Sequence, residues 1–424
     1  MSILSKDKVK PYWYTRYPYP TVDGSFIQNW LVNGWSFNRW LRELEILKEA
    51  GQNYLILAPT VSSNFGKNSR SIYPSQISGI TLTPGHEMTL ENCLKACQKL
   101  DMKLFLGLND DSHWWEMSEA DAPWFVGEME KGNAIAKELY VNYKTRYPET
   151  FYGWYWVFEI SSMHLAKPLY QEYLAKAINI QLDFLTNLDS SMPLMLCPYM
   201  VENVSSPEET YLAWSNFLKQ AHFRSGDILC PQDAVGAGWL RLENFTHWFL
   251  ALKKACKEVL GLKFWSDAET FRQEDWTSTT LDRFIEQLEL ASDVVDNFIS
   301  FAYCHYFSPQ IVPRGYHQTY LDYLKTGKLK KKPVLPPTNA KGCYKNDEIV
   351  LSWDKQSLDE ICGYLIYAHN HLQARLQPKP DPALRFELPS SYVLKKDLSN
   401  SKNYTLIAYD YAGNQAEPVC VTIE

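Results

Sequence analysis

Two glutamates each close a run of apolar and aromatic residues. Glu159 ends the run YGWYWVFE (152–159), and Glu269 ends the run KFWSDAE (263–269). Two carboxylates that face each other can cleave a glycosidic bond, because one protonates the departing oxygen while the other attacks the anomeric carbon or activates water. Their residue type and position make Glu159 and Glu269 candidate catalytic residues.

Asp267 lies two positions before Glu269 in the same run. Side chains two apart on a strand point to the same face of the sheet, so both acids would be directed to one side. We interpret Asp267 as lying one layer deeper than Glu269, where it orients a partner. The alternative for any single acid at a strand end is an ion pair or a helix cap. For Asp233, which precedes a glycine-containing loop, turn chemistry is an equal alternative.

The elements that must position these acids alternate along the chain from Gly24 to about Thr326, with short strand-like runs followed by longer amphipathic segments. This alternation is typical of an α/β protein with a parallel sheet. Strands are predicted at 24–30, 53–59, 103–109, 152–159, 193–199, 227–233, 263–269 and 297–306, and helices include 37–51, 170–188, 243–261 and 278–292. Eight such units in about 300 residues match the size of a (β/α)8 TIM barrel.

In a TIM barrel the active site lies at the carboxyl ends of the strands. Glu159 and Glu269 would then lie at the ends of strands four and seven, nearly opposite each other in the ring. The alternative fold is an open doubly wound sheet, whose nucleotide-binding forms usually carry a glycine-rich turn after the first strand. The corresponding segment LVNGWSFNRW (31–40) has one glycine. The sequence therefore favours the barrel and disfavours nucleotide chemistry.

Aromatic and polar residues also fall in or near the predicted loops at this face, where rings can stack on the C–H faces of a sugar. The segment NDDSHWWE (109–116) combines acids, a histidine and two rings that we expect to be exposed. The predicted substrate-binding residues are Trp30, Trp35, Asn109, Asp110, His113, Trp114, Trp115, Asp233, Trp239, Asp267, Tyr303, His305 and Tyr306, the last three on strand eight. For any one tryptophan, packing in the core is the alternative.

The composition and net charge limit the classes of molecule that the protein could bind. The 424-residue chain is 46% hydrophobic and 14% aromatic with a formal net charge of -7, which disfavours nucleic acid because phosphate binding needs clustered positive charge. Nine cysteines, an odd number without paired short spacings, argue against a disulfide framework. The first 14 residues lack the apolar stretch of a signal peptide, and no apolar run is long enough to span a bilayer. We expect a soluble, cytoplasmic protein without a cofactor, whose partner is an oligosaccharide or polysaccharide.

The composition changes abruptly in the segment KTGKLKKKPVLPPT (325–338), where lysines and then prolines accumulate as in inter-domain linkers. The chain then alternates strand-like runs without a helical pattern, which predicts a β-sandwich. Trp353, GYLIY (363–367) and YTLIAYDYAGN (404–414) resemble a fibronectin type III module. We predict a barrel domain at 1–326, a linker at 327–337 and a sandwich at 338–424.

The acids on strands four and seven resemble those of the retaining glycoside hydrolases built on TIM barrels. That resemblance implies that Glu159 is the acid/base and Glu269 the nucleophile. The segments YGWYWVFEIS, ILCPQDAVGAGW and LKFWSDAETF are similar to those of a bacterial family catalogued as a domain of unknown function, DUF4434, with a glycosidase-like barrel. One departure stands out: members of the retaining clan commonly place Asn before the acid/base Glu, whereas this chain has Phe158.

Three other function classes stay open. A metal-dependent hydrolase would use Asp110, Asp111, His113 and Asp233 as ligands, although the chain has no HExxH and no HxH on an early strand. A carbohydrate-binding barrel that has lost catalysis would explain Phe158. A cysteine nucleophile at Cys197, Cys230 or Cys304 is the weakest alternative, because free cysteines are among the most buried residues.

Overall fold

A computed structural model of the chain describes residues 16–118, 121–345, 348–395 and 403–423. The chain forms two compact units. The first comprises the chain up to Glu269 together with Gln287–Cys304, and the second comprises Thr270–Glu286 together with the chain from His305 onward. These units divide the chain at positions other than the predicted linker at 327–337, whose role as a domain boundary stays a prediction.

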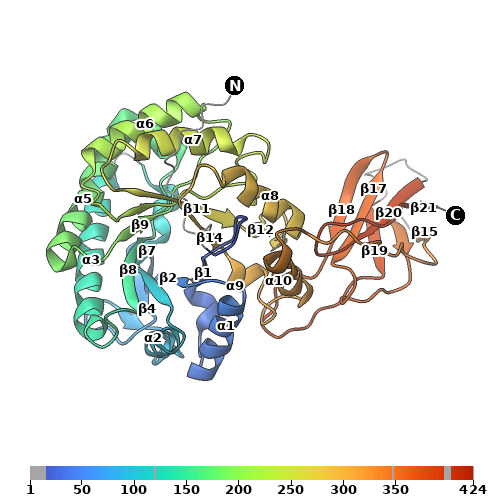
Figure 1. Cartoon of the computed structure of the whole chain (residues 1–424), viewed down its shortest axis with the longest axis horizontal. Coiled ribbons are helices and arrows are strands. Elements are labelled where there is room, and N and C mark those ends of the chain that lie inside the picture. Colours follow the sequence, from blue (N-terminus) through green and yellow to red (C-terminus); the bar gives the residue numbers. More distant parts are fainter. Residues whose placement is uncertain (1–15, 119–120, 346–347, 396–402, 424) are drawn as a thin grey trace. The chain divides into compact units, whose positions relative to one another are not determined.

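Eight parallel strands close into a barrel in the order β1-β14-β11-β10-β9-β8-β6-β2. The strands are β1 (Gly24–Gln28), β2 (Tyr54–Ala58), β6 (Lys103–Gly107), β8 (Phe151–Trp156), β9 (Leu194–Leu196), β10 (Ile228–Leu229), β11 (Lys263–Glu269) and β14 (Asn297–Phe301). Helices such as α3, α5, α6 and α7 surround the strands on the outside (Figure 1). The predicted (β/α)8 barrel is confirmed.

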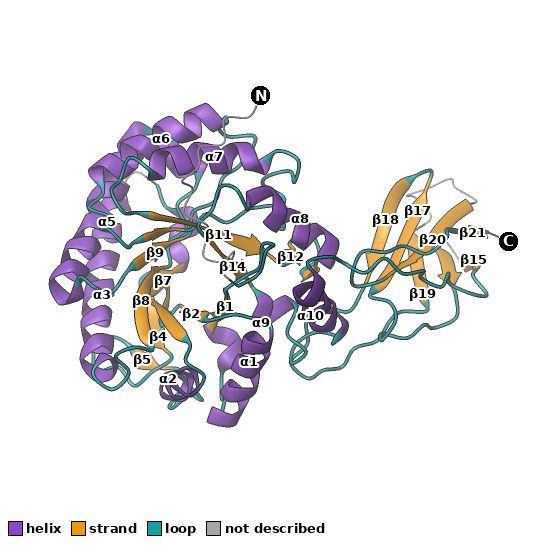
Figure 2. Cartoon of the chain, in the orientation of Figure 1, coloured by secondary structure: helices purple, strands orange, loops and turns teal. Residues whose placement is uncertain are grey.

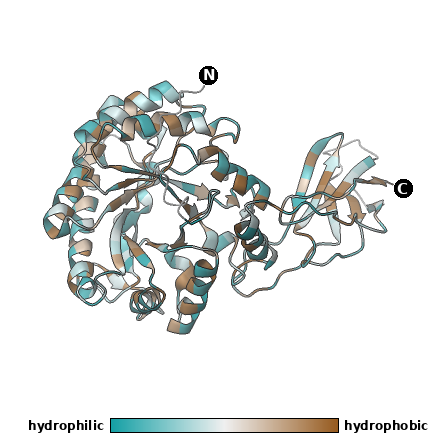
Figure 3. Ribbon diagram, viewed as in Figure 1, coloured by the Kyte–Doolittle hydropathy of each residue, from teal (hydrophilic) through white to brown (hydrophobic). Residues whose placement is uncertain are grey.

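The helices follow the strands as predicted (Figure 2). They are α1 (Phe37–Glu49), α2 (Thr89–Lys99), α3 (Ala122–Leu139), α4 (Ser162–Leu165), α5 (Pro168–Asp189), α6 (Pro207–Gln220), α7 (Phe245–Cys256), α8 (Leu281–Ala291), α9 (Tyr303–Tyr306) and α10 (Gly315–Thr326). Side chains fix their first turns: Ser36 caps α1, and Ser206 forms a capping box with Glu209 on α6. Hydrophobic and hydrophilic residues share the helices around the barrel (Figure 3), as expected for helices that cover a core on one side.

Short helices and strands lie in the loops that connect the barrel strands and helices. They are the 3-10 helices η2 (Asn29–Val32) and η3 (Ser112–Glu116), the π-helix η5 (Tyr140–Lys144) and the strands β3 (Val61–Asn64), β4 (Lys67–Ser71), β5 (Thr81–Leu82), β7 (Asn109–Asp111), β12 (Phe271–Arg272) and β13 (Thr277–Ser278). Strand β7 joins β3, β4 and β5 in a separate four-stranded sheet, so the segment that follows β6 extends beyond the barrel. In the part of the chain that the structure describes, no helix is long and apolar enough to cross a membrane.

Several barrel strands are shorter than predicted. Strands β9 and β10 end just before Cys197-Pro198 and Cys230-Pro231, and proline has no N–H to donate to a ladder. Asp233 therefore lies in the segment that follows β10. Strand β8 ends at Trp156, so Glu159 also lies beyond its strand, whereas Glu269 is the last residue of β11.

The prediction that Tyr303, His305 and Tyr306 lie on strand eight is wrong. Strand β14 ends at Phe301, and Tyr303–Tyr306 forms helix α9. Serine hydroxyls replace the sheet ladder at this point. The hydroxyl of Ser300 accepts the N–H of Tyr303 at 3.3 Å, and the hydroxyl of Ser25 accepts the N–H of Cys304 at 3.1 Å.

The interior of the barrel is filled by one apolar cluster to which every strand contributes. Its members include Phe26, Ile56, Phe105, Tyr155, Met195, Ile228, Trp265 and Ile299, one from each of the eight strands. Alternate residues of a barrel strand face the interior, so this layer fixes which side chains of each strand point inward. On β11 the inward positions after Trp265 are Asp267 and Glu269.

The C-terminal strands form two antiparallel sheets. One sheet contains β15 (Lys341–Lys345), β16 (Glu348–Ser352) and β19 (Ser391–Lys395), and the other contains β18 (His371–Leu376), β17 (Gly363–Ala368), β20 (Asn403–Tyr409) and β21 (Val419–Thr422). Their shared core includes Trp353 and Tyr364, whose rings lie 5.1 Å apart. Seven strands in two sheets make the predicted β-sandwich, an architecture that fibronectin type III modules share.

Candidate active site

The two candidate glutamates occupy inward positions at the carboxyl ends of β8 and β11. Glu269 lies four residues after Trp265, and Glu159 lies four residues after Tyr155, both members of the interior cluster. Val157, between Tyr155 and Glu159, also packs against that cluster, so the inward alternation continues beyond the end of β8. The barrel order places β9 and β10 between the two strands that carry the glutamates.

Glu159 is a partly buried carboxyl group with an amide partner. Burial raises its pKa from 4.5 to about 7, and a hydrogen bond with the side chain of Gln232 acts in the opposite direction. Burial disfavours the charged form of an acid, so Glu159 holds its proton at a pH where an exposed glutamate has lost it. A carboxylic acid poised in this way can serve as a general acid near neutral pH.

Glu269 is held in a different environment. It is 1% exposed, and its Oε2 accepts the backbone N–H of Ala237 at 2.7 Å. Its own N–H donates to Oδ2 of Asp233 at 3.2 Å. A backbone N–H that donates to a carboxylate stabilises the ionised form, which is the form that a nucleophile or general base requires.

Asp267 lies between Trp265 and Glu269 on the inward face of β11 and is fully buried. Burial, and then the charges of Glu269, Asp233 and Glu159, raise its pKa well above the ordinary value. Its Oδ1 has no hydrogen-bond partner among the described residues. These conditions favour the neutral form of Asp267.

Asp233 braces the loop that follows β10 against β11. Its Oδ1 accepts the N–H of Val235 at 3.1 Å, and its Oδ2 accepts both the N–H of Glu269 and the side-chain amide of Gln287. The same amide of Gln287 donates to the carbonyl oxygen of Glu269 at 3.1 Å. Asp233 thus makes the turn contact considered as its alternative role and also positions the backbone that carries Glu269.

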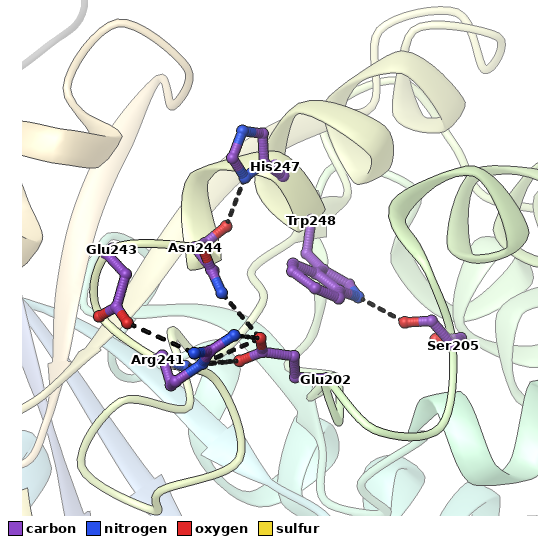
Figure 4. A network of polar contacts seen from close by, with 7 residues as sticks. All are labelled: Glu202, Ser205, Arg241, Glu243, Asn244, His247 and Trp248. Atoms are coloured by element: carbon purple, nitrogen blue, oxygen red, sulfur yellow. Dashed lines mark hydrogen bonds and ion pairs between the residues drawn. The ribbon is translucent and has the colours of Figure 1, made fainter.

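A polar network ties together the loops that follow β9 and β10 (Figure 4). Arg241 donates to Glu202, and the side-chain amide of Asn244 donates to the same carboxylate at 2.7 Å. These bonds, with Arg241 first, lower the pKa of Glu202 to about 2. The N–H of Glu202 donates to the carbonyl oxygen of Trp239 at 2.9 Å, so the network fixes the backbone of Trp239.

The predicted sugar-stacking rings divide into exposed and buried ones. Trp30, Trp115 and Trp239 are 62%, 64% and 44% exposed. Trp114, in contrast, is 3% exposed and stacks on His164 at 4.7 Å, so the expectation that both rings of the segment NDDSHWWE are exposed is wrong. Trp35 is half-buried with its ring 4.9 Å from that of Trp40.

The polar residues of the segment 109–116 are bound to neighbouring elements. The Asn109 amide donates to Glu128 at 2.7 Å. Burial raises the pKa of Asp110 to about 6, and the hydroxyl of Ser62 lies beside it. His113 lies 3.2 Å from Asp121. The substrate-binding roles of these residues stay predictions.

The three residues predicted on strand eight are buried, and they are divided between the two compact units. Tyr303 belongs to the first unit, and His305 and Tyr306 to the second. Burial lowers the pKa of His305 to about 3, so this histidine is neutral. The ring of Tyr306 stacks on Phe271 at 5.5 Å.

Phe158, the residue before Glu159, points away from the barrel interior. Its ring packs 5.1 Å from Phe125 on α3 and 5.4 Å from Trp114. Because alternate residues face opposite sides, Phe158 supports the strand from outside while Glu159 faces inward. An apolar ring thus occupies this position in the outer layer of the barrel.

The acids considered as metal ligands do not form one cluster. Asp111 accepts the N–H groups of Gly66 and His113 at 2.7 and 2.9 Å, whereas Asp233 is bound to Val235 and Gln287. In the described part of the chain, no group of three or more His, Cys, Asp or Glu side chains could hold a metal ion.

The three cysteines considered as nucleophiles are buried. Burial raises the pKa of Cys197 and of Cys304 well above the ordinary value and that of Cys230 above it. Buried thiols of this kind are protonated and therefore poor nucleophiles.

Sequence reasoning missed two groups that contact the glutamates. Gln232 follows Ile228 and Cys230 at the inward spacing of two, so its position after strand six carried a signal that could have identified it. The donor to Glu269 is the backbone N–H of Ala237, and a backbone group leaves no signature in the residue type.

Comparisons with known proteins agree with this barrel. Residues 22–312 match the family described as Domain of unknown function (DUF4434). No curated protein matches the chain. A candidate alpha-L-fucosidase from Bacteroides thetaiotaomicron VPI-5482 is similar in structure, with a TM-score of 0.61 at 19% identity, covering 77% of this chain and 98% of its own.

Other structural neighbours are more distant. An intracellular xylanase from Thermoanaerobacterium saccharolyticum JW/SL-YS485 has a TM-score of 0.41 at 10% identity, covering 70% of this chain and 89% of its own. A protein described as a glycoside hydrolase has a TM-score of 0.45 at 11% identity, covering 93% and 94%. The neighbours are glycoside hydrolases, and the likeness to the first of them shows a glycosidase-like barrel fold.

Proposed function

The chain belongs to the family described as a domain of unknown function, DUF4434, and we propose that it is a glycoside hydrolase with Glu159 as acid/base and Glu269 as nucleophile. The contrast between the two carboxylates carries this proposal. Burial raises the pKa of Glu159 to about 7, whereas Glu269 accepts a backbone N–H at 2.7 Å. Environments that favour a protonated acid beside an ionised one separate the roles of acid and nucleophile.

The proposed reaction has two steps. Glu159 donates its proton to the glycosidic oxygen as the C–O bond breaks, and a carboxylate oxygen of Glu269 bonds to the anomeric carbon. Glu159, now ionised, then takes a proton from water, whose oxygen attacks the anomeric carbon and releases Glu269. Two displacements at one carbon give net retention of configuration, which requires the carboxylates to lie about 5–5.5 Å apart with substrate bound.

Neighbouring side chains support this assignment. The side chain of Gln232 hydrogen-bonds to Glu159, and burial raises the pKa of Asp267, which favours its neutral form beside Glu269. The partly exposed rings of Trp30, Trp115 and Trp239 offer surfaces on which a neutral sugar can stack. The proposed substrate is therefore an oligosaccharide or a polysaccharide.

A second candidate, a carbohydrate-binding barrel without catalysis, is favoured by the burial of Glu269. A nucleophile must touch the anomeric carbon, and a residue that is 1% exposed cannot do so unless the loop that carries Ala237 moves away. The hydrolase proposal therefore requires that this loop opens when substrate binds.

Reducing-sugar release from a broad panel of oligosaccharides and polysaccharides tests the proposal, with wild type compared with Glu269→Gln and with and without a chelator. We expect activity that is lost in the variant and indifferent to the chelator, with the variant still folded by circular dichroism. Glu130→Gln on α3, an exposed position, is the matched control. Wild-type turnover in Glu269→Gln contradicts its assigned role, chelator sensitivity favours the metal-dependent alternative, and sugar binding without cleavage favours the binding barrel.

A further inference from the structure

A short hairpin in the second compact unit brings an arginine close to the sandwich. Strands β12 and β13 pair Arg272 with Thr277, and β18 carries Arg375. The side-chain amide of Gln377, just beyond β18, donates to the carbonyl oxygen of Ser278 on β13 at 2.7 Å. This hydrogen bond places the end of β18 beside the hairpin.

The charge of Arg375 acts on Arg272. Burial, and then the charge of Arg375, lower the pKa of Arg272. Among the described residues, neither guanidinium forms an ion pair with a carboxylate, and Nε of Arg272 is buried without a hydrogen-bond partner. Asp275 lies on the same hairpin and its charge reaches Arg272, but its Oδ1 accepts the N–H and hydroxyl of Thr277 at 3.0 and 2.6 Å.

The other acidic groups next to the arginines are neutral. Cys362 is buried, and burial raises the pKa of its thiol to about 12 although both arginines act to lower it. Tyr409, whose ring lies 5.7 Å from the Arg375 guanidinium, has a pKa raised well above the ordinary value by burial. Its hydroxyl donates to Gln377 at 2.6 Å. Neither group supplies the missing negative charge near neutral pH.

Two neighbouring guanidiniums without an ion-paired carboxylate are costly, because charge that is partly removed from water needs an opposite partner in contact with it. The guanidinium presents its N–H donors as a planar fork that matches the oxygens of a carboxylate, sulfate or phosphate group. We propose that Arg272 and Arg375 form a binding site for a ligand that carries such an oxyanion. This site stands on its own residues and does not depend on the proposed glycosidase activity.

Melting of the full chain in sodium sulfate, and in sodium chloride of equal ionic strength, tests the site. In sulfate at about ten times the dissociation constant, we expect wild type to melt about 2 °C higher than in chloride. Arg272→Gln and Arg375→Gln should lose this difference. Arg385→Gln is the matched control, because Arg385 is exposed and paired with Asp381 at 3.1 Å, and it should keep the difference.

The same scans separate a binding site from a structural pair. In chloride, removing one of two mutually repelling charges should leave the melting temperature unchanged or raise it. A fall of several degrees in both variants would mean that the arginines bind protein groups, and an equal sulfate effect in all four proteins would mean a general salt effect. Either result overturns the proposal.

Calorimetric titration with sulfate, glucuronate and glucose 6-phosphate then identifies the source of the oxyanion. Tighter binding of sulfate than of either sugar acid indicates a site for a free inorganic anion, and tighter binding of glucuronate or glucose 6-phosphate than of sulfate indicates a site for an acidic sugar. In both cases Arg272→Gln should weaken binding at least tenfold. No heat with any of the three probes refutes the site.

Discussion

Replacement of Glu159 by Gln should stabilise the protein at alkaline pH while it removes activity. A buried acid whose pKa is raised loses free energy of unfolding as the pH rises, because ionisation is harder in the folded chain than in the unfolded one. The pKa of Glu159 rises from 4.5 to about 7. At about 1.4 kcal/mol for each pH unit, the cost of ionising it in the folded protein is about 3 kcal/mol.

The sign of this effect defines the pH window. Below pH 4.5 the carboxyl group is protonated in both the folded and the unfolded states, and the cost is absent. The cost develops between pH 4.5 and about 7 and is complete above that. Glu159→Gln removes the ionisable group, so its free energy of unfolding should equal that of wild type near pH 4 and exceed it by up to about 3 kcal/mol at pH 8.

Urea unfolding of both proteins at pH 4, 6 and 8 measures the difference, with Glu130→Gln on α3 as the exposed control. The control should show no growing difference with pH. If Glu159→Gln is less stable than wild type at pH 8, or if the difference is the same at all three values, Glu159 is not a strained acid in the folded protein. The argument that it is protonated near neutral pH would then fail.

Three further outcomes are expected. Gln232→Leu should move the alkaline limb of the kcat/KM profile up by about one pH unit, because it removes a hydrogen bond that lowers the pKa of Glu159. Gln220→Leu, at an exposed position of α6, is the control. If the limb does not move in Gln232→Leu, the hydrogen bond between Gln232 and Glu159 does not lower the pKa of Glu159. Trp239→Ala should raise KM roughly tenfold with little change in kcat, measured by initial rates, because an exposed ring stacks on sugar in the ground state and the transition state alike. Proton NMR of the first-formed product should show retained anomeric configuration, and inversion would replace the nucleophile role of Glu269 by that of a general base.

The sequence predicted the barrel and its inward acids well, because both depend on local periodicity. A strand has a period of two, so Trp265, Asp267 and Glu269 had to share a face wherever the strand lay. The sequence predicted the end of strand eight too late in the chain, because Tyr303 and Tyr306 are residue types that are common in strands, although they lie in helix α9. The N–H of Cys304, within the helix, donates to the hydroxyl of Ser25, which lies 279 residues away in the sequence, and sequence alone does not bring these two residues together.

The exposure of the two tryptophan rings in the segment 109–116 also depends on residues that are distant in the sequence, so it could not be predicted. Trp114 and Trp115 are adjacent, yet Trp114 is buried and Trp115 is exposed. The difference arises from Phe158 and His164, which reach Trp114 from the segment after β8. No pattern within the segment 109–116 contains those partners.

The sequence indicated the positions of the two glutamates, but it could not show which of them would be the acid and which the nucleophile in the proposed reaction. Both end apolar runs, and by residue type they are identical. What distinguishes them is a side-chain amide from Gln232 beside Glu159 and a backbone N–H from Ala237 on Glu269, and both donors lie in the segment after β10. One loop thus contacts both acids and gives each a different partner, so a change in that loop would alter the proposed acid and the proposed nucleophile together. Residue type identified the two candidates, and the contacts of this loop give each of them a different environment.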